Sequence, residues 1–373
     1  MKASESLARL LLVMRELIDD LRSWPPSRER LIDELEALLG VVLAIALARL
    51  ARVDHVGWAA FSGYMVMRSH VATTCRRGID RIIGTAGGAL LACVSVPYVY
   101  TSTVLCCLCL AVFGFVSLWF VMISLRSYAW LFAGITFCMV FISGSLSPSQ
   151  TAHYAISRTL EVTIGTFACV LVSAATTYLL RRGAGAPECP SAEHPEIPSV
   201  RRLQYALQGT AALAIIPLVA HQLGSEAMQQ ASTTILAVMT VPPASATLSS
   251  GPTTSKLRLR LTGCLMGGLL ATAVLLISHR SPEVMTLFLC VAVVIGRHIE
   301  NGPHRVGYSG TQFVLAFLTV LVPDRFDTAS YGPGFERLGG IFAGTLMLEP
   351  IRLLLGLART IRHRQETTSS RNS

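Results

Sequence analysis

The chain has 373 residues, of which 52% are hydrophobic and 14% are charged, and its mean hydropathy is +0.55. Soluble domains carry about 25% charged residues, so this composition excludes an ordinary soluble enzyme and predicts an all-α polytopic membrane protein. A net charge of +9 would suggest a nucleic-acid partner for a soluble protein, but in a membrane protein the positions of the charges indicate orientation.

The first 36 residues precede the first long apolar block, and we expect them to lie at the cytoplasmic surface. Arg9 and Arg15 interrupt the apolar core that a signal peptide requires. Apolar residues recur at spacings of three and four, which predicts an amphipathic helix on the inner membrane surface, and Trp24-Pro25-Pro26 should end it.

Twelve apolar blocks follow. Most of them are close in length to the ~20 residues that a membrane-spanning helix requires. We predict spans near residues 37–53, 56–72, 80–98, 103–123, 127–146, 154–180, 203–221, 227–248, 259–277, 283–298, 307–323 and 335–357. The second and eighth blocks are short or polar at their edges, which leaves an uncertainty of one or two spans. The predicted organisation is an N-terminal segment, a six-helix repeat, a Pro- and Gly-rich linker, a second six-helix repeat and a basic tail, at residues 1–36, 37–180, 181–202, 203–357 and 358–373.

The distribution of Lys and Arg tests this topology, because basic residues gather in short cytoplasmic loops. With the N-terminus inside, most of the 31 Lys and Arg residues fall on the cytoplasmic side. The exceptions are Arg49, Arg52, Arg158, Arg280, Arg325 and Arg337. We therefore predict a multi-pass protein of the bacterial inner membrane with both termini in the cytoplasm.

Two motifs of the first half recur in the second half at one spacing. Arg81–Ala92 reads RIIGTAGGALLA and Arg260–Ala271 reads RLTGCLMGGLLA, which is an offset of 179 residues. The same offset of 179 relates Arg158, Gly165 and Thr166 to Arg337, Gly344 and Thr345. Because each half has an even number of predicted spans, this recurrence predicts two parallel repeats related by an axis along the membrane normal.

Small residues near the start of the third and ninth predicted spans allow helix backbones to approach closely. We expect a packing role for Gly84, Gly88, Gly263 and Gly267. The arginine before each group, Arg81 or Arg260, is expected to extend toward cytoplasmic phosphate groups, with a cytoplasmic gate as the alternative.

Charged groups inside the spans are the strongest pointers to a transport site, because an Arg at mid-bilayer costs at least ~2.5 kcal/mol. Arg158 lies in the sixth span with Glu161 three residues later, whereas Arg337, its counterpart, has Gly340 in place of that partner. Arg337 is therefore freer to meet an anion, although both arginines could simply anchor helix ends at the outer headgroups.

Interrupted helices form the second pointer. Pro242 and Pro243 should break the eighth span, and Ser62-Gly63-Tyr64 occupies the corresponding depth of the second span. A simple kink is the alternative interpretation. Further polar or aromatic contacts to a substrate are expected from Tyr64, Trp130, Thr136, Thr311 and Gln312.

Enzymatic and metal chemistry find little support in the sequence. The stretch Gly251–Lys256 lacks the second glycine of a phosphate-binding loop, and most cysteines lie in apolar blocks, where we expect them to be small core residues. Histidines and carboxylates show no metal-ligand spacing. We expect no catalytic residues, no cofactor and no metal.

The short motifs resemble a known family. Trp58-Ala59-Ala60, then Arg77 and Arg81 leading into Gly84-Thr85, then Arg158-x-x-Glu161-x-x-x-Gly165-Thr166 are similar to the fusaric acid resistance protein family, also called aromatic acid exporters. The second half repeats the pattern with Pro242, Lys256, Arg260, Gly263 and Gly267. The resemblance implies efflux of weak organic acids, such as hydroxybenzoates or fusaric acid, across the bacterial inner membrane, often with a periplasmic adaptor protein.

The combined hypothesis is a secondary transporter that exports aromatic or other weak organic acids. Glu161 is the expected proton carrier if export is coupled to protons, with His153 and His221 as weaker candidates. The alternatives are an organic-anion channel of the same fold and a membrane scaffold without transport. The bilayer and a small organic anion are the expected partners, and a homo-oligomer stays open.

Overall fold

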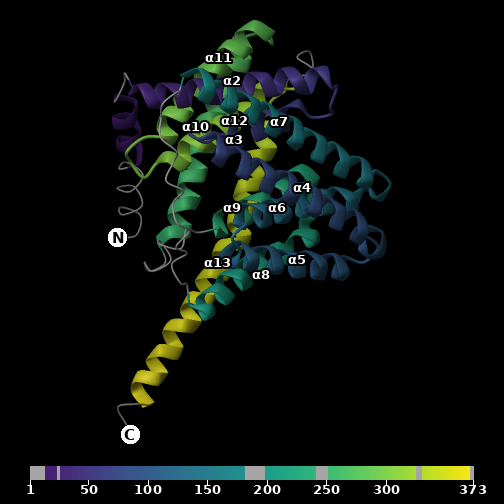
Figure 1. Cartoon of the computed structure of the whole chain (residues 1–373). Helices are drawn as coiled ribbons and strands as arrows, with labels where there is room; N and C mark the ends of the chain where they lie inside the picture. Colours follow the sequence, from purple (N-terminus) through teal and green to yellow (C-terminus); the bar gives the residue numbers. More distant parts are fainter. Residues whose placement is uncertain (1–12, 23–25, 181–197, 241–250, 325–329, 370–373) are drawn as a thin grey trace.

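The computed structural model describes residues 13–22, 26–180, 198–240, 251–324 and 330–369, and all regular structure in these residues is helical (Figure 1). The first half contains α2 (Arg28–Leu50), α3 (Val56–Val66), α4 (Val71–Val99), α5 (Thr103–Ile123), α6 (Ser127–Leu146), a 3-10 turn (Pro148–Gln150) and α7 (Thr151–Leu180). The second half contains α8 (Ser199–Leu223), α9 (Ser225–Met239), α10 (Gly251–Ile277), α11 (Pro282–Glu300), α12 (Gly307–Leu321) and α13 (Gly332–Ser369). The prediction of an all-α polytopic membrane protein is confirmed.

Within these described residues, seven helical stretches are long and apolar enough to cross a membrane. They are Val71–Val99, Thr103–Ile123, Ser127–Leu146, Pro148–Leu180, Ser199–Ala220, Thr253–Ile277 and Pro282–Glu300. The helices α3, α9 and α12 are shorter, and α3 with its 11 residues extends only about 16 Å, half the ~30 Å hydrocarbon core. The predicted number of twelve spans stays a prediction.

The proposed interruption at Ser62-Gly63-Tyr64 is wrong, because α3 is a continuous helix through these residues. Gly63 instead permits close packing against α2: a Cβ atom there would lie 3.0 Å from both the Gly40 carbonyl oxygen and the Ala44 Cβ. Its counterpart, Pro242-Pro243, lies outside the described residues. What α3 and α9 share is their short length.

Packing contacts recur between the halves. The helix α4 packs along α6 as α10 packs along α12, and α3 contacts α7 as α9 contacts α13. Contacts that join the halves recur as well: α5 lies beside α8 and α11 lies beside α2, while α6 contacts α9 and α12 contacts α3. Figure 1 shows α5 and α8 side by side across the lower part of the molecule. These contacts between helices of the two halves form one common interface.

The N-terminal segment is helical over residues 13–22, and it packs against the protein itself. Leu17 is buried in a small apolar cluster with Leu259, Ile299 and Val306. The Asp20 carboxylate lies 2.6 Å from His304 Nδ1, in the turn before α12. This segment therefore docks onto the ends of α10, α11 and α12.

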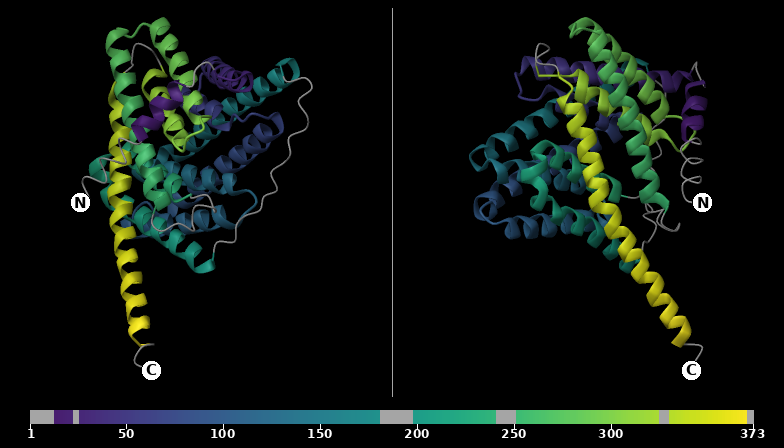
Figure 2. Two further views of the ribbon diagram at one scale, coloured as in Figure 1. Left: turned by 90° about the vertical axis from the view of Figure 1, so that its left-hand side faces the viewer. Right: turned by 180° about the vertical axis from the view of Figure 1, so that it is seen from behind.

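The helix α13 continues through residues that we assigned to the C-terminal tail, and it ends at Ser369. Its last turns extend beyond the rest of the molecule, as the yellow ribbon shows in both views of Figure 2. The other end of α13 begins at the interface of the halves, and there it carries Arg337.

Candidate functional site

A cavity of about 120 Å³ lies where the two halves meet. Side chains from α3, α4, α6 and α7 line one part, and side chains from α9, α10, α12 and α13 line the other. Neither Asp nor Glu occurs among the described residues of its lining, which includes five basic residues: Arg81, Arg158, Lys256, Arg260 and Arg337. The cavity is thus a concentrated positive site in an apolar part of the chain.

A wider vestibule of about 270 Å³ adjoins this cavity. Five residues line both spaces and mark the passage between them: Trp58, Phe61, Arg158, Gln230 and Arg337. Acidic residues line only the vestibule, namely Glu226, Asp324 and Glu336. On the predicted topology the vestibule opens outward. Together the two spaces reach the range of about 300–1,000 Å³ that is typical of small-molecule sites.

Arg81 projects from α4 into the cavity. Its side chain is 2% exposed, donates to Ser62 Oγ over 3.1 Å and to the Tyr128 hydroxyl over 3.3 Å, and lies 4.0 Å from the Phe132 ring centroid. The expectation that this side chain extends to cytoplasmic phosphates is wrong. The reason is that α4 begins at Val71, so Arg81 lies almost three turns inside a helix that we expected to begin beside it.

Arg260 occupies the equivalent place on α10. It donates to Thr234 Oγ1 over 3.2 Å, to the Tyr308 hydroxyl over 3.3 Å and to Gln312 Oε1 over 3.0 Å. It is also 2% exposed, so it does not reach the headgroups either. Its Nη2 atom is buried and has no hydrogen-bond partner in the part of the chain that the structure describes.

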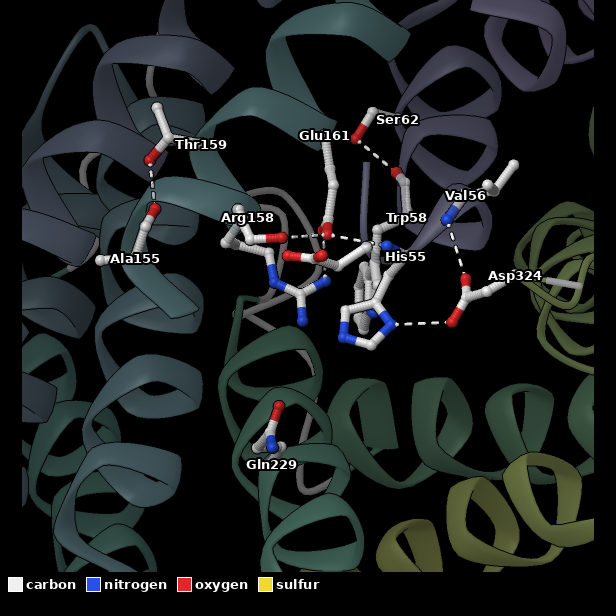
Figure 3. A network of polar contacts seen from close by, with 12 residues as sticks. His55, Val56, Trp58, Ser62, Ala155, Arg158, Thr159, Glu161, Gln229 and Asp324 are labelled. Carbon is white, nitrogen blue, oxygen red and sulfur yellow. Dashed lines mark hydrogen bonds and ion pairs between the residues drawn. The ribbon is translucent and has the colours of Figure 1, made fainter. Parts of the chain in front are cut away.

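Arg158, on α7, carries its own counter-charge. Its guanidinium lies 3.1 Å from Glu161 and 4.2 Å from the Trp58 ring centroid. The Glu161 carboxylate also accepts from Ser157 Oγ over 2.7 Å. It accepts from the His55 backbone N–H over 3.2 Å as well, a contact that Figure 3 shows as a dashed line. The Glu161 carboxylate therefore compensates most of the positive charge of Arg158.

Arg337, on α13, has only neutral partners among the described residues. It donates to Gln230 Oε1 over 3.4 Å and to Gln312 Oε1 over 3.3 Å, and it lies 5.7 Å from the Phe61 ring centroid. The predicted contrast with Arg158 therefore exists in the structure: one arginine has a carboxylate partner and the other has amides.

Arg260 and Arg337 are close neighbours, because both contact one oxygen atom of Gln312. Two donor nitrogens on one oxygen can be no more than about 6 Å apart. At that separation two positive charges repel by roughly 3 kcal/mol with an effective dielectric constant of ~20. A neutral amide cannot cancel this repulsion, whereas a bound anion would.

A clasp at the vestibule mouth joins the two halves. Asp324, which follows α12, lies 3.1 Å from His55 Nδ1 and accepts from the Val56 N–H over 3.0 Å at the start of α3 (Figure 3). The hydrogen bond to Asp324 raises the pKa of His55 above its ordinary value, against the opposing effect of burial. This contact is therefore sensitive to pH.

Comparison with known families adds an independent observation. A family model described as fusaric acid resistance protein-like matches residues 43–172 and 211–348, which is more than half of the chain. The chain belongs to the fusaric acid resistance protein-like family. No curated protein and no solved structure matched the chain.

The two stretches that match the family model correspond to the two halves of the fold. Its first stretch runs from α2 into α7 and contains Arg81 and Arg158, and its second runs from α8 into α13 and contains Arg260 and Arg337. Membership in the fusaric acid resistance protein-like family, together with the long apolar helices, supports a transporter-type multi-pass membrane protein.

Several residues that we expected to contact substrate do not line the cavity. The Tyr64 hydroxyl is buried and donates to Glu300 over 2.7 Å, while Ser62 accepts from Arg81 and Gly63 packs on α2. Trp130 stacks on Phe120 with a centroid distance of 4.4 Å. Thr311 is buried near the site without lining it. These residues lie outside the lining of this cavity, and their contact with a substrate stays a prediction.

The other predicted residues reach the cavity or lie outside the described chain. Thr136, Gln312, Arg158 and Arg337 line it, whereas Pro242 and Pro243 are not described. Of the predicted proton carriers, Glu161 forms an ion pair with Arg158, and His153 lies 3.1 Å from Asp54 at the surface. The side chain of His221 lies outside the described part.

The predicted glycines lie at helix contacts. A Cβ atom on Gly84 or Gly88 would collide with backbone carbonyls of α6, those of Ala129 and Ala133. On α10, Cβ atoms at Gly263 and Gly267 would collide with the Ser309 and Phe313 carbonyls of α12. This geometry matches the packing interpretation.

Sequence reasoning missed three cavity residues that contact the arginines: Phe132, Gln230 and Tyr308. A signal was present for one of them. Tyr128 and Tyr308 stand 180 residues apart and each bonds one of the arginines Arg81 and Arg260, so extending the repeat to α6 and α12 would have found Tyr308.

Proposed function

We propose that this protein exports small organic anions, in particular aromatic or other weak organic acids, across the bacterial inner membrane as a secondary transporter with cytoplasmic termini. One observation carries the proposal: the cavity between the halves is lined by five basic residues and by no described carboxylate. Four of the five are arginines, which recognise carboxylates through two parallel hydrogen bonds.

Aromatic side chains support the preference for an aromatic acid. Trp58, Phe61 and Phe132 line the cavity, and Trp58 and Phe61 lie 5.1 Å apart between ring centroids. Rings of this kind can stack on the ring of a substrate while an arginine binds its carboxylate. The family description, which names fusaric acid resistance, is consistent with such a cargo.

Energetics favour export of an anion from a cell that is negative inside. Moving one negative charge outward yields ~2.3 kcal/mol per 100 mV of membrane potential, which corresponds to a roughly fifty-fold gradient. If protons are also exchanged, Glu161 is our candidate carrier, because it is buried and paired with Arg158, which lines the vestibule.

Replacement of Arg337 tests the proposal. In proteoliposomes or intact cells, Arg337→Ala should abolish export of a benzoate-like acid while membrane insertion is retained, because the guanidinium without a carboxylate partner is lost. Arg280→Ala is the matched control, since Arg280 is exposed in the connection between α10 and α11. Export by Arg337→Ala at the wild-type rate would rule out this site.

An organic-anion channel is the second candidate, and the joining of vestibule and cavity through shared lining residues favours it. A channel would pass ohmic anion currents across a planar bilayer, and these currents would not depend on a proton gradient. A carrier would show saturable flux without such currents.

A further inference from the structure

Gln312 occupies the position that a counter-ion would take. Its Oε1 atom accepts from Arg260 Nη1 over 3.0 Å and from Arg337 Nη2 over 3.3 Å. The Gln312 side chain is 2% exposed and both guanidinium groups are buried with it. One neutral oxygen therefore joins two positive groups from different helices, α10 and α13.

The guanidinium groups retain unused donors around this amide. Arg260 Nη2 and Arg337 Nε are buried without hydrogen-bond partners in the described residues. Buried donors of this kind are costly unless a ligand or water satisfies them. Each arginine thus has one nitrogen held by Gln312 and another free to bind an additional acceptor.

The first half provides a comparison within the same cavity. Phe132, on α6, occupies the place that Gln312 occupies on α12, and its ring stacks on Arg81 at 4.0 Å without accepting a hydrogen bond. Arg158, the counterpart of Arg337, is paired with Glu161 at 3.1 Å. Two arginines that share an amide and lack a carboxylate therefore occur only on the second-half side of the described cavity.

We propose that Arg260 and Arg337 form the binding subsite for the carboxylate group of a small organic anion, and that the Gln312 amide holds this subsite until the anion displaces it. The inference rests on the proposed function, because it assigns the polar end of the cargo to one side of the cavity. In the bound state the two carboxylate oxygens take the donors of Arg260 and Arg337, and Gln312 Oε1 is released.

This role predicts opposite effects for two substitutions of one residue. Gln312→Glu places a permanent carboxylate between the arginines, so purified full-length protein should unfold at a higher temperature without ligand. Its affinity for benzoate should fall about ten- to a hundredfold, because the internal carboxylate competes for the same donors. Gln312→Leu removes the competitor, so benzoate should bind about two- to tenfold more tightly although the ligand-free protein is less stable.

Gln230→Glu is the matched control for charge. It adds the same negative charge to the cavity, but in the described residues the Gln230 side chain accepts from Arg337, over 3.4 Å, and not from Arg260. It should therefore weaken benzoate binding less than Gln312→Glu does. Benzamide, which has the same ring without the charge, should not bind measurably to any of these proteins. Binding is measured by isothermal titration calorimetry and by thermal shift.

The outcomes separate this inference from the proposed function. Unchanged benzoate affinity in Gln312→Glu, or a tenfold loss in Gln312→Leu, would overturn the inference, the second because it would mean that Gln312 itself holds the ligand. A wild-type protein that binds neither benzoate nor acetate would also overturn it. If the affinities shift as expected while proteoliposomes show no flux, the subsite stands and the proposed export fails.

Discussion

At the residue scale, the four cavity arginines differ in their partners. Those of the first half contact aromatic rings, and Arg158 also has the Glu161 carboxylate. Those of the second half contact the amides of Gln230 and Gln312. Because amides leave the positive charge uncompensated, the second half presents the stronger attraction for an anion.

The clasp between His55 and Asp324 predicts a dependence of stability on pH. Because Asp324 raises the pKa of His55 in the folded protein, the stabilisation is fully present below the unfolded value of about 6.5 and is lost as the pH rises through the folded value. The nearby Glu161 and Arg158 charges act on the same histidine in opposite directions. We expect the unfolding temperature of the wild type to decline above that pH relative to His55→Gln.

Thermal unfolding between about pH 5.5 and 8.5 checks this prediction. His279→Asn is the control, because it removes an exposed histidine outside the clasp at a positive φ of 47°, which Asn tolerates. Identical pH profiles for the wild type and His55→Gln would show that the clasp contributes nothing.

At the element scale, the contact between α4 and α6 depends on two glycines that face carbonyl groups. Gly88→Ala should destabilise the protein by about 1–3 kcal/mol, because the added Cβ collides with the Ala133 carbonyl and the backbones must separate. Gly87→Ala is the matched control in the same helix, where nothing lies within 4 Å of an added Cβ. It should be neutral or slightly stabilising, since Ala favours helix over Gly.

Unfolding temperatures of the two purified variants provide the comparison. Equal stability of Gly88→Ala and Gly87→Ala would contradict the close packing of α4 on α6.

Elements were predictable where apolar blocks were long. The blocks at 103–123 and 127–146 coincide with α5 and α6, because their boundaries are also boundaries of hydrophobicity. The start of α4 was misplaced, since the polar residues before Arg81 resemble a loop although they belong to the helix. This error, and the same error at the start of α10, placed Arg81 and Arg260 at the membrane surface rather than in the cavity.

At the scale of the whole molecule, the cavity exists only because the halves meet. The sequence predicted Arg158 and Arg337 as a pair through their common offset, and both line the cavity. It could not predict that Gln312 joins Arg260 to Arg337, because these residues come from three helices whose approach depends on packing across the interface. The family match over both halves agrees with this two-part construction.

The most direct test of an anion site between the halves is a structure of the full-length protein with bound 4-bromobenzoate, in which anomalous scattering from bromine locates the ligand. We expect the bromine among Trp58, Phe61 and Phe132, with the carboxylate between Arg260 and Arg337. A ligand bound only outside the cavity, or bound there with its carboxylate away from both arginines, would contradict the assignment.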